Sequence, residues 1–167
     1  MAFNVIGKHM PIGLPGQVMK QSYNVIETHA QDPDNPVTAY GVPVKLTGGK
    51  AIAYTSGGID GFSVRPDAVQ LGGANPVFGD SGVPDPQQPL DVMVSGYIAV
   101  KVKAGISPEV GKGVYIFTST GSSGEPVGTI SNAADSGHTT LLNNSVFETG
   151  VDDNNVAVIR IGMVYTM

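Results

Sequence analysis

Glycine and proline interrupt nearly every ten-residue stretch of this chain, and this feature limits its possible folds more than any other. The 167 residues include 23 glycines and 12 prolines. Both residue types weaken or break helices, so we expect no long helix and only a short helical turn around Asn132 to Ser136. With a hydrophobic content of 41%, the chain still has enough apolar residues to fold. It is therefore predicted to be all-β, a small barrel or sandwich with frequent tight turns.

The clearest predicted strand covers residues 90–103, LDVMVSGYIAVKVK. Apolar residues alternate along it, as expected for a strand with one buried and one solvated face. The face predicted to be buried carries Leu90, Val92, Val94, Ile98, Val100 and Val102, and the opposite face carries Asp91, Ser95, Lys101 and Lys103.

Two other segments show strand patterns. In residues 38–46 one face carries Tyr40, Val42, Val44 and Leu46, while Pro43 lacks a backbone N–H and predicts an edge strand. Residues 155–167 are apolar on both faces, with Ala157, Ile159, Ile161 and Met163 on one and Val156, Val158 and Val164 on the other. Such a strand is covered on both sides, either by two sheets or by a partner.

The segment between these strands has the pattern of a β-corner followed by a hairpin. AGISPEVGKG (residues 104–113) is predicted to be a tight connection and VYIFTS (114–119) a strand. TGSSGEP (120–126) is typical of a hairpin loop, and VGTISN (127–132) is the predicted return strand.

The first third of the chain has a different character, because its prolines disfavour the interior of a sheet. Residues 1–36 are predicted to form an N-terminal arm, and residues 37–167 the β-barrel domain. The arm either packs on its own barrel or crosses onto a neighbouring subunit. Residues 72–89, also rich in proline, are predicted to be a loop excursion outside the barrel. The residues predicted to contact other subunits are Met10, Pro11, Ile12, Leu14, Pro15, Met19, Val77 and Phe78.

Motifs for catalysis, cofactors or metals are missing from the sequence. His9, His29 and His138 are widely separated and lack metal-binding spacing. The acidic turns DPDN (32–35) and DDNN (152–155) do not continue into the glycine and distal glutamate of a calcium loop. There is no cysteine, no G-x-S-x-G motif and no phosphate-binding P-loop. We therefore predict no enzyme, metal site or cofactor.

The charge balance points to protein partners. The net charge of −5 opposes binding to the phosphates of nucleic acid, and only 14% of the residues are charged, which favours close contact with other protein surfaces. No apolar run is long enough to span a bilayer, and the N-terminus lacks the apolar stretch of a secretory signal. We expect synthesis in the cytoplasm, without a nucleic-acid or membrane partner.

Two short motifs, GGIDGF (57–62) and STGSSG (119–124), resemble the uridine-discriminating and glycine-rich segments of trimeric deoxyuridine triphosphatases. The resemblance implies that Asp60 binds a hydroxyl group or activates water, with Arg65 as the nearby cation. The Arg-Ser-Ser-Gly phosphate segment of that family is missing, and a long strand-rich stretch follows the glycine-rich motif here. A deoxyuridine triphosphatase is therefore kept only as the least favoured of the alternative functions.

Residues 92–164 resemble the barrel of capsid decoration, or cement, proteins of tailed bacteriophages. The resemblance lies in the strand GYIAVKVK, the corner ISPEVGKGVY, the hairpin around TSTGSSG and the late strand NVAVIRIG. It implies a virion structural protein that binds the outer capsid surface, bridges subunits of the major capsid protein and stabilises the head. We expect a homo-oligomer, with a trimer favoured over a dimer. A tail component or carbohydrate-binding virion module is the alternative, although the chain has no tryptophan to form a platform for a sugar.

Overall fold

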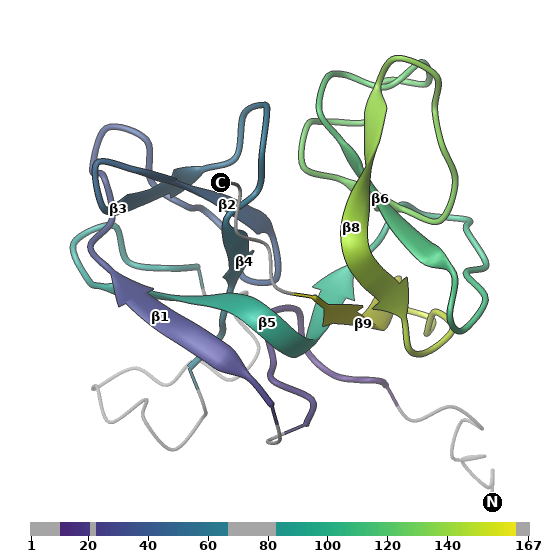
Figure 1. The fold of residues 1–167 in the computed structure, drawn as a ribbon, viewed down its shortest axis with the longest axis horizontal. Coiled ribbons are helices and arrows are strands. Elements are labelled where there is room, and N and C mark those ends of the chain that lie inside the picture. The colour runs from purple at the N-terminus through teal and green to yellow at the C-terminus, as the bar shows by residue number, and fades with distance from the viewer. Residues whose placement is uncertain (1–10, 21–22, 67–82, 163–167) are drawn as a thin grey trace, which may run out of the picture.

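The computed structural model describes residues 11–20, 23–66 and 83–162, which form nine β-strands joined by turns and loops (Figure 1). These strands are β1 (Val25–His29), β2 (Pro43–Thr47), β3 (Lys50–Ala53), β4 (Gly61–Ser63), β5 (Leu90–Lys101), β6 (Gly113–Phe117), β7 (Ile130–Ser131), β8 (Thr139–Phe147) and β9 (Val156–Ile161). No helix occurs within the described ranges, and hence none there that could cross a membrane. The predicted all-β fold is confirmed.

The predicted helical turn around Asn132 to Ser136 is wrong. Bends and a turn take its place. The hydroxyl of Ser131 accepts the N–H of Ala133, and the hydroxyl of Thr139 accepts the N–H of Asp135. Side-chain oxygens that bind nearby backbone N–H groups compete with the hydrogen bonds of a helix.

The strands form two curled lobes that share β5 (Figure 1). The sheet order is β3-β2-β4-β5-β9-β8-β6-β7, with β1 added on β5, and the strand pairs are antiparallel. The first lobe consists of β1 to β4 with the first half of β5, and the second lobe consists of β6 to β9 with its second half. Each lobe curls back on itself through an isolated bridge, Gln31 to Ala51 in the first and Val102 to Ile130 in the second.

Two hydrophobic clusters form the core. The main cluster draws Phe62 and Met93 from the first lobe and Ile116, Phe147 and Ile159 from the second. Because both lobes contribute to it, they pack as a single unit. The second cluster lies within the first lobe and consists of Val37, Val44, Ala51, Leu90 and Val92.

Strand β5 confirms the predicted strand but corrects its predicted faces. Leu90 and Val92 pack in the second cluster, whereas Ile98 and Val100 pack in the main cluster. The cause is a β-bulge: consecutive residues of β1 pair with Met93 and Ser95, which leaves Val94 without a partner. One inserted residue reverses the facing of every residue after it, so β5 supplies side chains to both clusters.

The predicted face of residues 38–46 is confirmed, because Val44 belongs to the second cluster and Tyr40, Val42 and Leu46 pack against it. The prediction of an edge strand is wrong, since β2 lies between β3 and β4. Pro43 is the first residue of β2. A residue without a backbone N–H is tolerated at that position.

Strand β9 is buried on both faces, as its sequence predicts. Ala157, Ile159 and Ile161 lie in the main cluster, and Val156 and Val158 on the other face are also buried. The chain itself therefore covers both faces of this strand. Met163 and Val164 lie outside the described residues.

The N-terminal segment runs antiparallel to the second half of β5. Gly16 and Met19 donate backbone hydrogen bonds to Ala99 and Tyr97 at 2.8 and 2.9 Å, and the N–H of Ala99 donates to Gln17 at 2.9 Å. β9 pairs with the same part of β5, and the residues of an antiparallel strand bond alternately to the neighbours on its two sides, so the segment lies along the other edge of the strand. This part of the predicted arm is a component of the protein's own sheet.

A close approach of two glycines fixes this segment on the first lobe. Gly16 and Gly41 have φ angles of 85° and 70°, which side chains rarely tolerate. A Cβ on Gly41 would lie 2.5 Å from the backbone nitrogen of Gly16. Arg65 completes the contact, because its Nε donates to the carbonyl oxygen of Pro15 at 3.1 Å.

Candidate interaction surface

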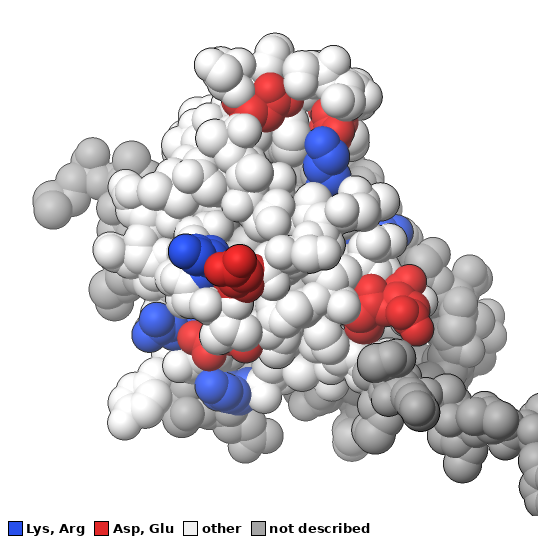
Figure 2. Space-filling model, turned by 90° about the vertical axis from the view of Figure 1, so that its right-hand side faces the viewer, with Lys and Arg blue, Asp and Glu red and all other residues white. Residues whose placement is uncertain are grey.

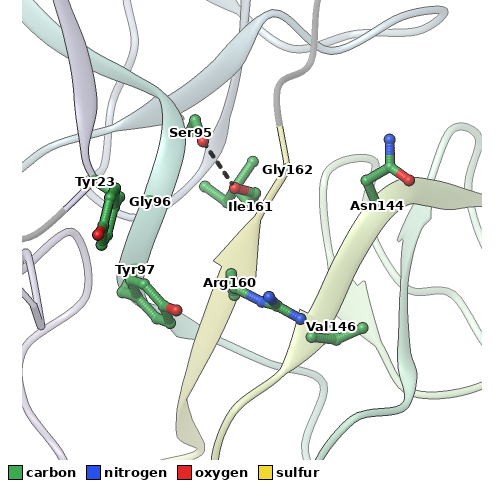
Figure 3. Close-up of a pocket in the computed structure, with 9 residues that line it drawn as sticks. All are labelled: Tyr23, Ser95, Gly96, Tyr97, Asn144, Val146, Arg160, Ile161 and Gly162. Carbon is green, nitrogen blue, oxygen red and sulfur yellow. Dashed lines mark hydrogen bonds between the residues drawn. The ribbon is translucent and has the colours of Figure 1, made fainter.

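An open concavity of about 600 Å³ lies beside the point where β5 passes between the lobes (Figure 3). Its walls come from the turn before β1 and from β5, β8 and β9. The residues that line it are Tyr23, Ser95, Gly96, Tyr97, Asn144, Val146, Arg160, Ile161 and Gly162. Two tyrosine rings and an arginine in one open hollow are typical of a protein contact, because these residues dominate binding energy at interfaces.

The wall of this concavity on the β1 side is formed by a strained turn. Tyr23 has a φ angle of 66° and is 91% exposed. The next residue, Asn24, holds the turn in place: its Oδ1 accepts the N–H of Tyr97 at 3.2 Å, and its Nδ2 donates to the carbonyl oxygen of Lys20. The turn thereby presents the ring of Tyr23 to solvent.

Arg160, which lines the concavity, shares one carboxylate with Lys20. Nε of Arg160 lies 3.1 Å from Oε1 of Glu148, and Nζ of Lys20 lies 3.9 Å from Oε2. Lys20 also lies 4.0 Å from the centre of the Tyr97 ring, a cation–π geometry. Two cations share one anion, so this part of an acidic protein is locally positive.

Glycines form the floor of the concavity. Gly96 has a φ of 138°, and a Cβ on it would collide with the side chain of Asn24. A Cβ on Gly162 would collide with Asn144. The shape of the hollow therefore depends on close contacts that only glycine allows.

The residues predicted to contact other subunits lie elsewhere. Pro11 and Leu14 are exposed, and Ile12, Pro15 and Met19 are half-buried along the docked N-terminal segment. None of these five residues lines the concavity. Met10, Val77 and Phe78 lie outside the described residues.

The sequence contained a signal for Arg160 but not for Tyr23. Arg160 is the only charged residue in the otherwise apolar β9, which indicates a position that faces solvent. The prominence of Tyr23 comes from its unusual backbone angle, which no local pattern predicted.

The predicted loop excursion, residues 72–89, is described only from Val83 onward. Buried Gln31 ties this end of the segment to the first lobe, because its Nε2 donates to the carbonyl oxygens of Asp85 and Gln88 at 2.6 and 3.2 Å.

Other large apolar residues are exposed on each lobe. Val25 and Ile26 follow the Tyr23 turn on β1 in the first lobe. On the second lobe, Val110 in the β5–β6 connection is 67% exposed and Leu141 on β8 is 45% exposed. The face of the second lobe carries few charged side chains, and several of these lie in adjacent basic and acidic pairs (Figure 2).

The histidines and acidic turns make local contacts. The imidazole of His29 lies 3.2 Å from the carboxylate of Glu27, and that of His138 lies 3.1 Å from the hydroxyl of Ser119. His9 lies outside the described residues. In the acidic turns, Asp32 and Asp152 accept hydrogen bonds from backbone N–H groups. No described cluster of three or more histidine, aspartate or glutamate side chains could hold a metal.

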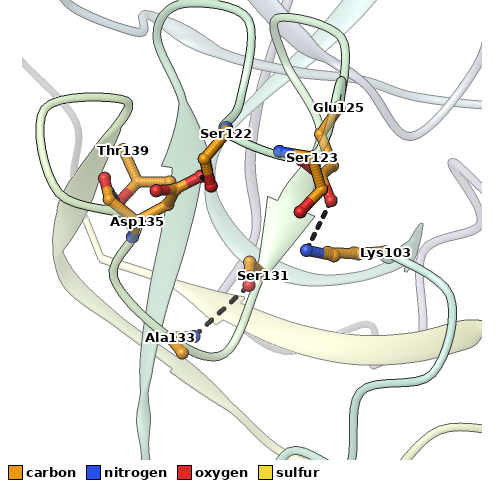
Figure 4. A network of polar contacts seen from close by, with 8 residues as sticks. All are labelled: Lys103, Ser122, Ser123, Glu125, Ser131, Ala133, Asp135 and Thr139. Atoms are coloured by element: carbon orange, nitrogen blue, oxygen red, sulfur yellow. Dashed lines mark hydrogen bonds and ion pairs between the residues drawn. The ribbon is translucent and has the colours of Figure 1, made fainter.

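Carboxylates occupy the N–H donors of the serine-rich loop that resembles a phosphate-binding segment (Figure 4). Ser122 donates through its N–H and hydroxyl to Asp135 at 2.9 and 2.8 Å, and the N–H of Ser123 donates to Glu125 at 3.2 Å. The hydrogen bond from Lys103, 2.5 Å away, holds the pKa of Glu125 below its usual value, and the bonds from Ser122 do the same for Asp135. Ionised carboxylates at these donors disfavour a phosphate.

The other two residues of the enzyme resemblance make structural contacts. Oδ2 of Asp60 accepts the backbone N–H of Leu46 at 2.7 Å. Arg65, besides binding Pro15, stacks over the ring of Tyr40 at 4.9 Å. Neither residue lines the concavity.

The two lobes share one core and each exposes large apolar residues, an arrangement typical of proteins that bind other proteins. The chain belongs to the structural cement proteins of bacteriophages. The family model described as "Structural cement protein (E217 gp24/Pam3 gp6)" matches residues 3–162. The protein is therefore a structural component of the phage virion that stabilises the capsid, and its family is a structural one, not an enzyme class.

A solved structure supports the fold. A chain in the capsid of Myoviridae phage XM1 superposes with a TM-score of 0.68 at 22% sequence identity, covering 99% of this chain and 100% of that one. No curated protein matches the sequence. The resemblance of residues 92–164 to cement proteins is confirmed, and the match extends it through the N-terminal region.

Proposed function

We propose that this cement protein binds the outer surface of the assembled head and bridges neighbouring subunits of the major capsid protein. The observation that supports bridging is the distribution of exposed apolar residues. Tyr23, Val25 and Ile26 lie on the first lobe, while Val110 and Leu141 lie on the second. A bridge needs two contact surfaces on one rigid body, and the shared main cluster makes the two lobes one body.

The charge of the protein favours the outer surface over the inner one. The inside of a filled head presents packaged DNA, and a protein with a net charge of −5 is repelled by phosphates. The outside presents protein, which suits a surface with few charges.

The predicted homo-oligomer, a trimer in preference to a dimer, strengthens this binding. Each copy then needs only moderate affinity, because linked contacts raise the overall affinity by roughly 100-fold or more. Exposed Pro11 and Leu14 of the N-terminal segment, together with Met10, Val77 and Phe78 outside the described residues, are the contacts that we propose with neighbouring subunits.

The test uses heads that lack this protein. Purified protein added to them should appear by electron microscopy on the outer surface, and the heads should then resist heating better. The variant Leu141→Asp introduces a charge on the second lobe, at an exposed position that belongs to neither hydrophobic cluster. It should still bind through the first lobe but no longer stabilise the heads. Density inside the head or on the tail, or heads whose heat resistance is unchanged by the wild-type protein, would overturn the proposal.

A further inference from the structure

We infer that the concavity around Tyr23, Tyr97 and Arg160 is the anchor that holds this protein on the head. The occupant is a segment of the major capsid protein that brings a carboxylate beside an apolar side chain. This inference rests on the proposed function and adds to it the contact surface and the chemistry of the partner.

Residues with a strained, positive φ angle are concentrated at this concavity. Three described residues other than glycine have a positive φ: Tyr23, Asn144 and Asn155, at 66°, 57° and 59°. Two of the three line the hollow. Asparagine adopts this conformation readily, but a bulky tyrosine is an outlier there. Strain of this kind persists where the surroundings enforce it, and it concentrates at functional sites.

The strained turn is preorganised for binding. The two hydrogen bonds of Asn24, one to the N–H of Tyr97 and one to the carbonyl of Lys20, hold the backbone at Tyr23 and Asn24 in place without a partner. Tyr23 is nonetheless 91% exposed. An exposed aromatic ring on a fixed backbone loses little entropy on binding, which is the property of an interface anchor.

The charges at the concavity specify a carboxylate. Glu148 engages only Nε of Arg160, and the other four N–H donors of this guanidinium have no partner within the described part of the chain. Lys20 shares the same carboxylate at 3.9 Å. A guanidinium with two free nitrogens binds a carboxylate through both oxygens. Tyr97, Val146 and Ile161 supply the apolar surface beside it.

Charge also argues against a second copy as the occupant. Around a two-fold axis through the concavity, Arg160 and Lys20 would lie near the same two cations, which is unfavourable. We assign the carboxylate to the capsid protein, and the oligomeric state of the variants tests the alternative, a different surface of a second copy.

The test measures co-sedimentation of variants with heads that lack this protein. Tyr23→Gly removes the ring and relieves the strained φ, so it should melt no lower than wild type yet bind at least about tenfold more weakly. Arg160→Gln should weaken binding by a similar factor and reduce its dependence on salt, and Arg160→Glu should weaken it further. Two controls match these changes away from the concavity: Asn155→Gly relieves a similar backbone angle, and Lys50→Glu reverses an exposed charge on β3. Both should bind like wild type.

Three outcomes have distinct meanings. If wild-type protein binds and stabilises heads while Tyr23→Gly and Arg160→Gln bind equally well, the anchor is elsewhere and only this inference fails. If Tyr23→Gly or Arg160→Gln changes the oligomeric state in analytical ultracentrifugation, the occupant is a second copy and the assignment to the capsid protein is wrong. If wild-type protein itself does not bind, the proposed function fails first.

Discussion

The carboxylate of Asp152 binds the backbone N–H of Ile12, which lies 140 positions earlier in the chain, at 3.0 Å. The other oxygen of Asp152 accepts the N–H groups of Asn154 and Val156 at 2.9 Å. One side chain thus shapes the turn before β9 and fastens the N-terminal segment to it. This contact joins the two ends of the described chain.

We expect this contact to weaken in acid. Burial raises the pKa of Asp152, but the N–H donors of Val156, Ile12 and Asn154 together outweigh it and keep the pKa below its ordinary value of 3.8. Because the folded pKa is lower than the unfolded one, the stabilisation is fully present above 3.8 and is lost as pH falls through the folded value.

Asp152→Asn isolates this effect. Above the ordinary pKa the variant should be less stable than wild type by about 1 kcal/mol, the scale of a side chain that caps backbone N–H groups at a solvated site. The difference should shrink as the pH is lowered. Thermal melting of both proteins from about pH 6 to about pH 3 measures it, and a difference that stays constant over this range would contradict the assignment.

The contact between Gly16 and Gly41 gives a second prediction. Gly41→Ala places a Cβ 2.5 Å from the nitrogen of Gly16 and 3.0 Å from the oxygen of Ala99, in a backbone conformation that disfavours alanine. Gly48→Ala has a similar positive φ but no atom within 4 Å of the new Cβ.

Both changes should lower the free energy of unfolding by about 1 kcal/mol, because alanine disfavours a positive φ. Gly41→Ala should lower it by roughly a further 1–3 kcal/mol, because the new Cβ overpacks the contact. Urea denaturation gives both values. Equal losses in the two variants would show that the glycine contact does not hold the segment.

The bulge in β5 makes its two halves respond differently to the same substitution pattern. Val100 is fully buried in the main cluster, and its neighbour Lys101 is exposed. Val100→Asp should cost several kcal/mol, because it buries an unpaired carboxylate, whereas Lys101→Asp should cost little. Met93→Asp should be as costly as Val100→Asp, although the two positions have opposite parity in the sequence. Melting temperatures of the three variants test this prediction. A mild effect of Met93→Asp would show that the faces of β5 alternate without interruption, as the sequence pattern alone predicted.

Much of the fold followed from patterns that act over a few residues. The face of Tyr40, Val42, Val44 and Leu46 was predicted because residues two apart share a face of a strand. The faces of β5 were not, because a bulge depends on how β1 pairs with it. The turn at Asn132 to Ser136 was not predicted either, because the hydroxyls of Ser131 and Thr139 accept N–H groups two and four positions away and compete with the hydrogen bonds of a helix.

The candidate interaction surface was less predictable than the fold. Its parts come from four separate segments, and the prominence of Tyr23 comes from a backbone angle that Asn24 enforces through Tyr97, 73 positions away. Apolar residues in the N-terminal segment were the natural candidates for contact, yet part of that segment is half-buried against its own chain. That residues 1–10, which precede the described part of this segment, contact a neighbouring subunit remains a prediction.

Two truncations separate the docked part of the N-terminal segment from the residues that precede it. Removing residues 1–16 deletes the N–H of Ile12, the carbonyl of Pro15 and the glycine contact, so the protein should melt several degrees lower. Removing residues 1–10 leaves each of these contacts intact and should leave the melting temperature unchanged. If the residues up to Met10 reach a neighbouring subunit, the shorter truncation should bind heads more weakly despite its full stability. Circular dichroism and co-sedimentation of the same samples provide both readings. A 1–10 truncation that binds fully would confine the capsid contact to the described body of the protein, whereas one that melts early would show that these residues belong to its own fold.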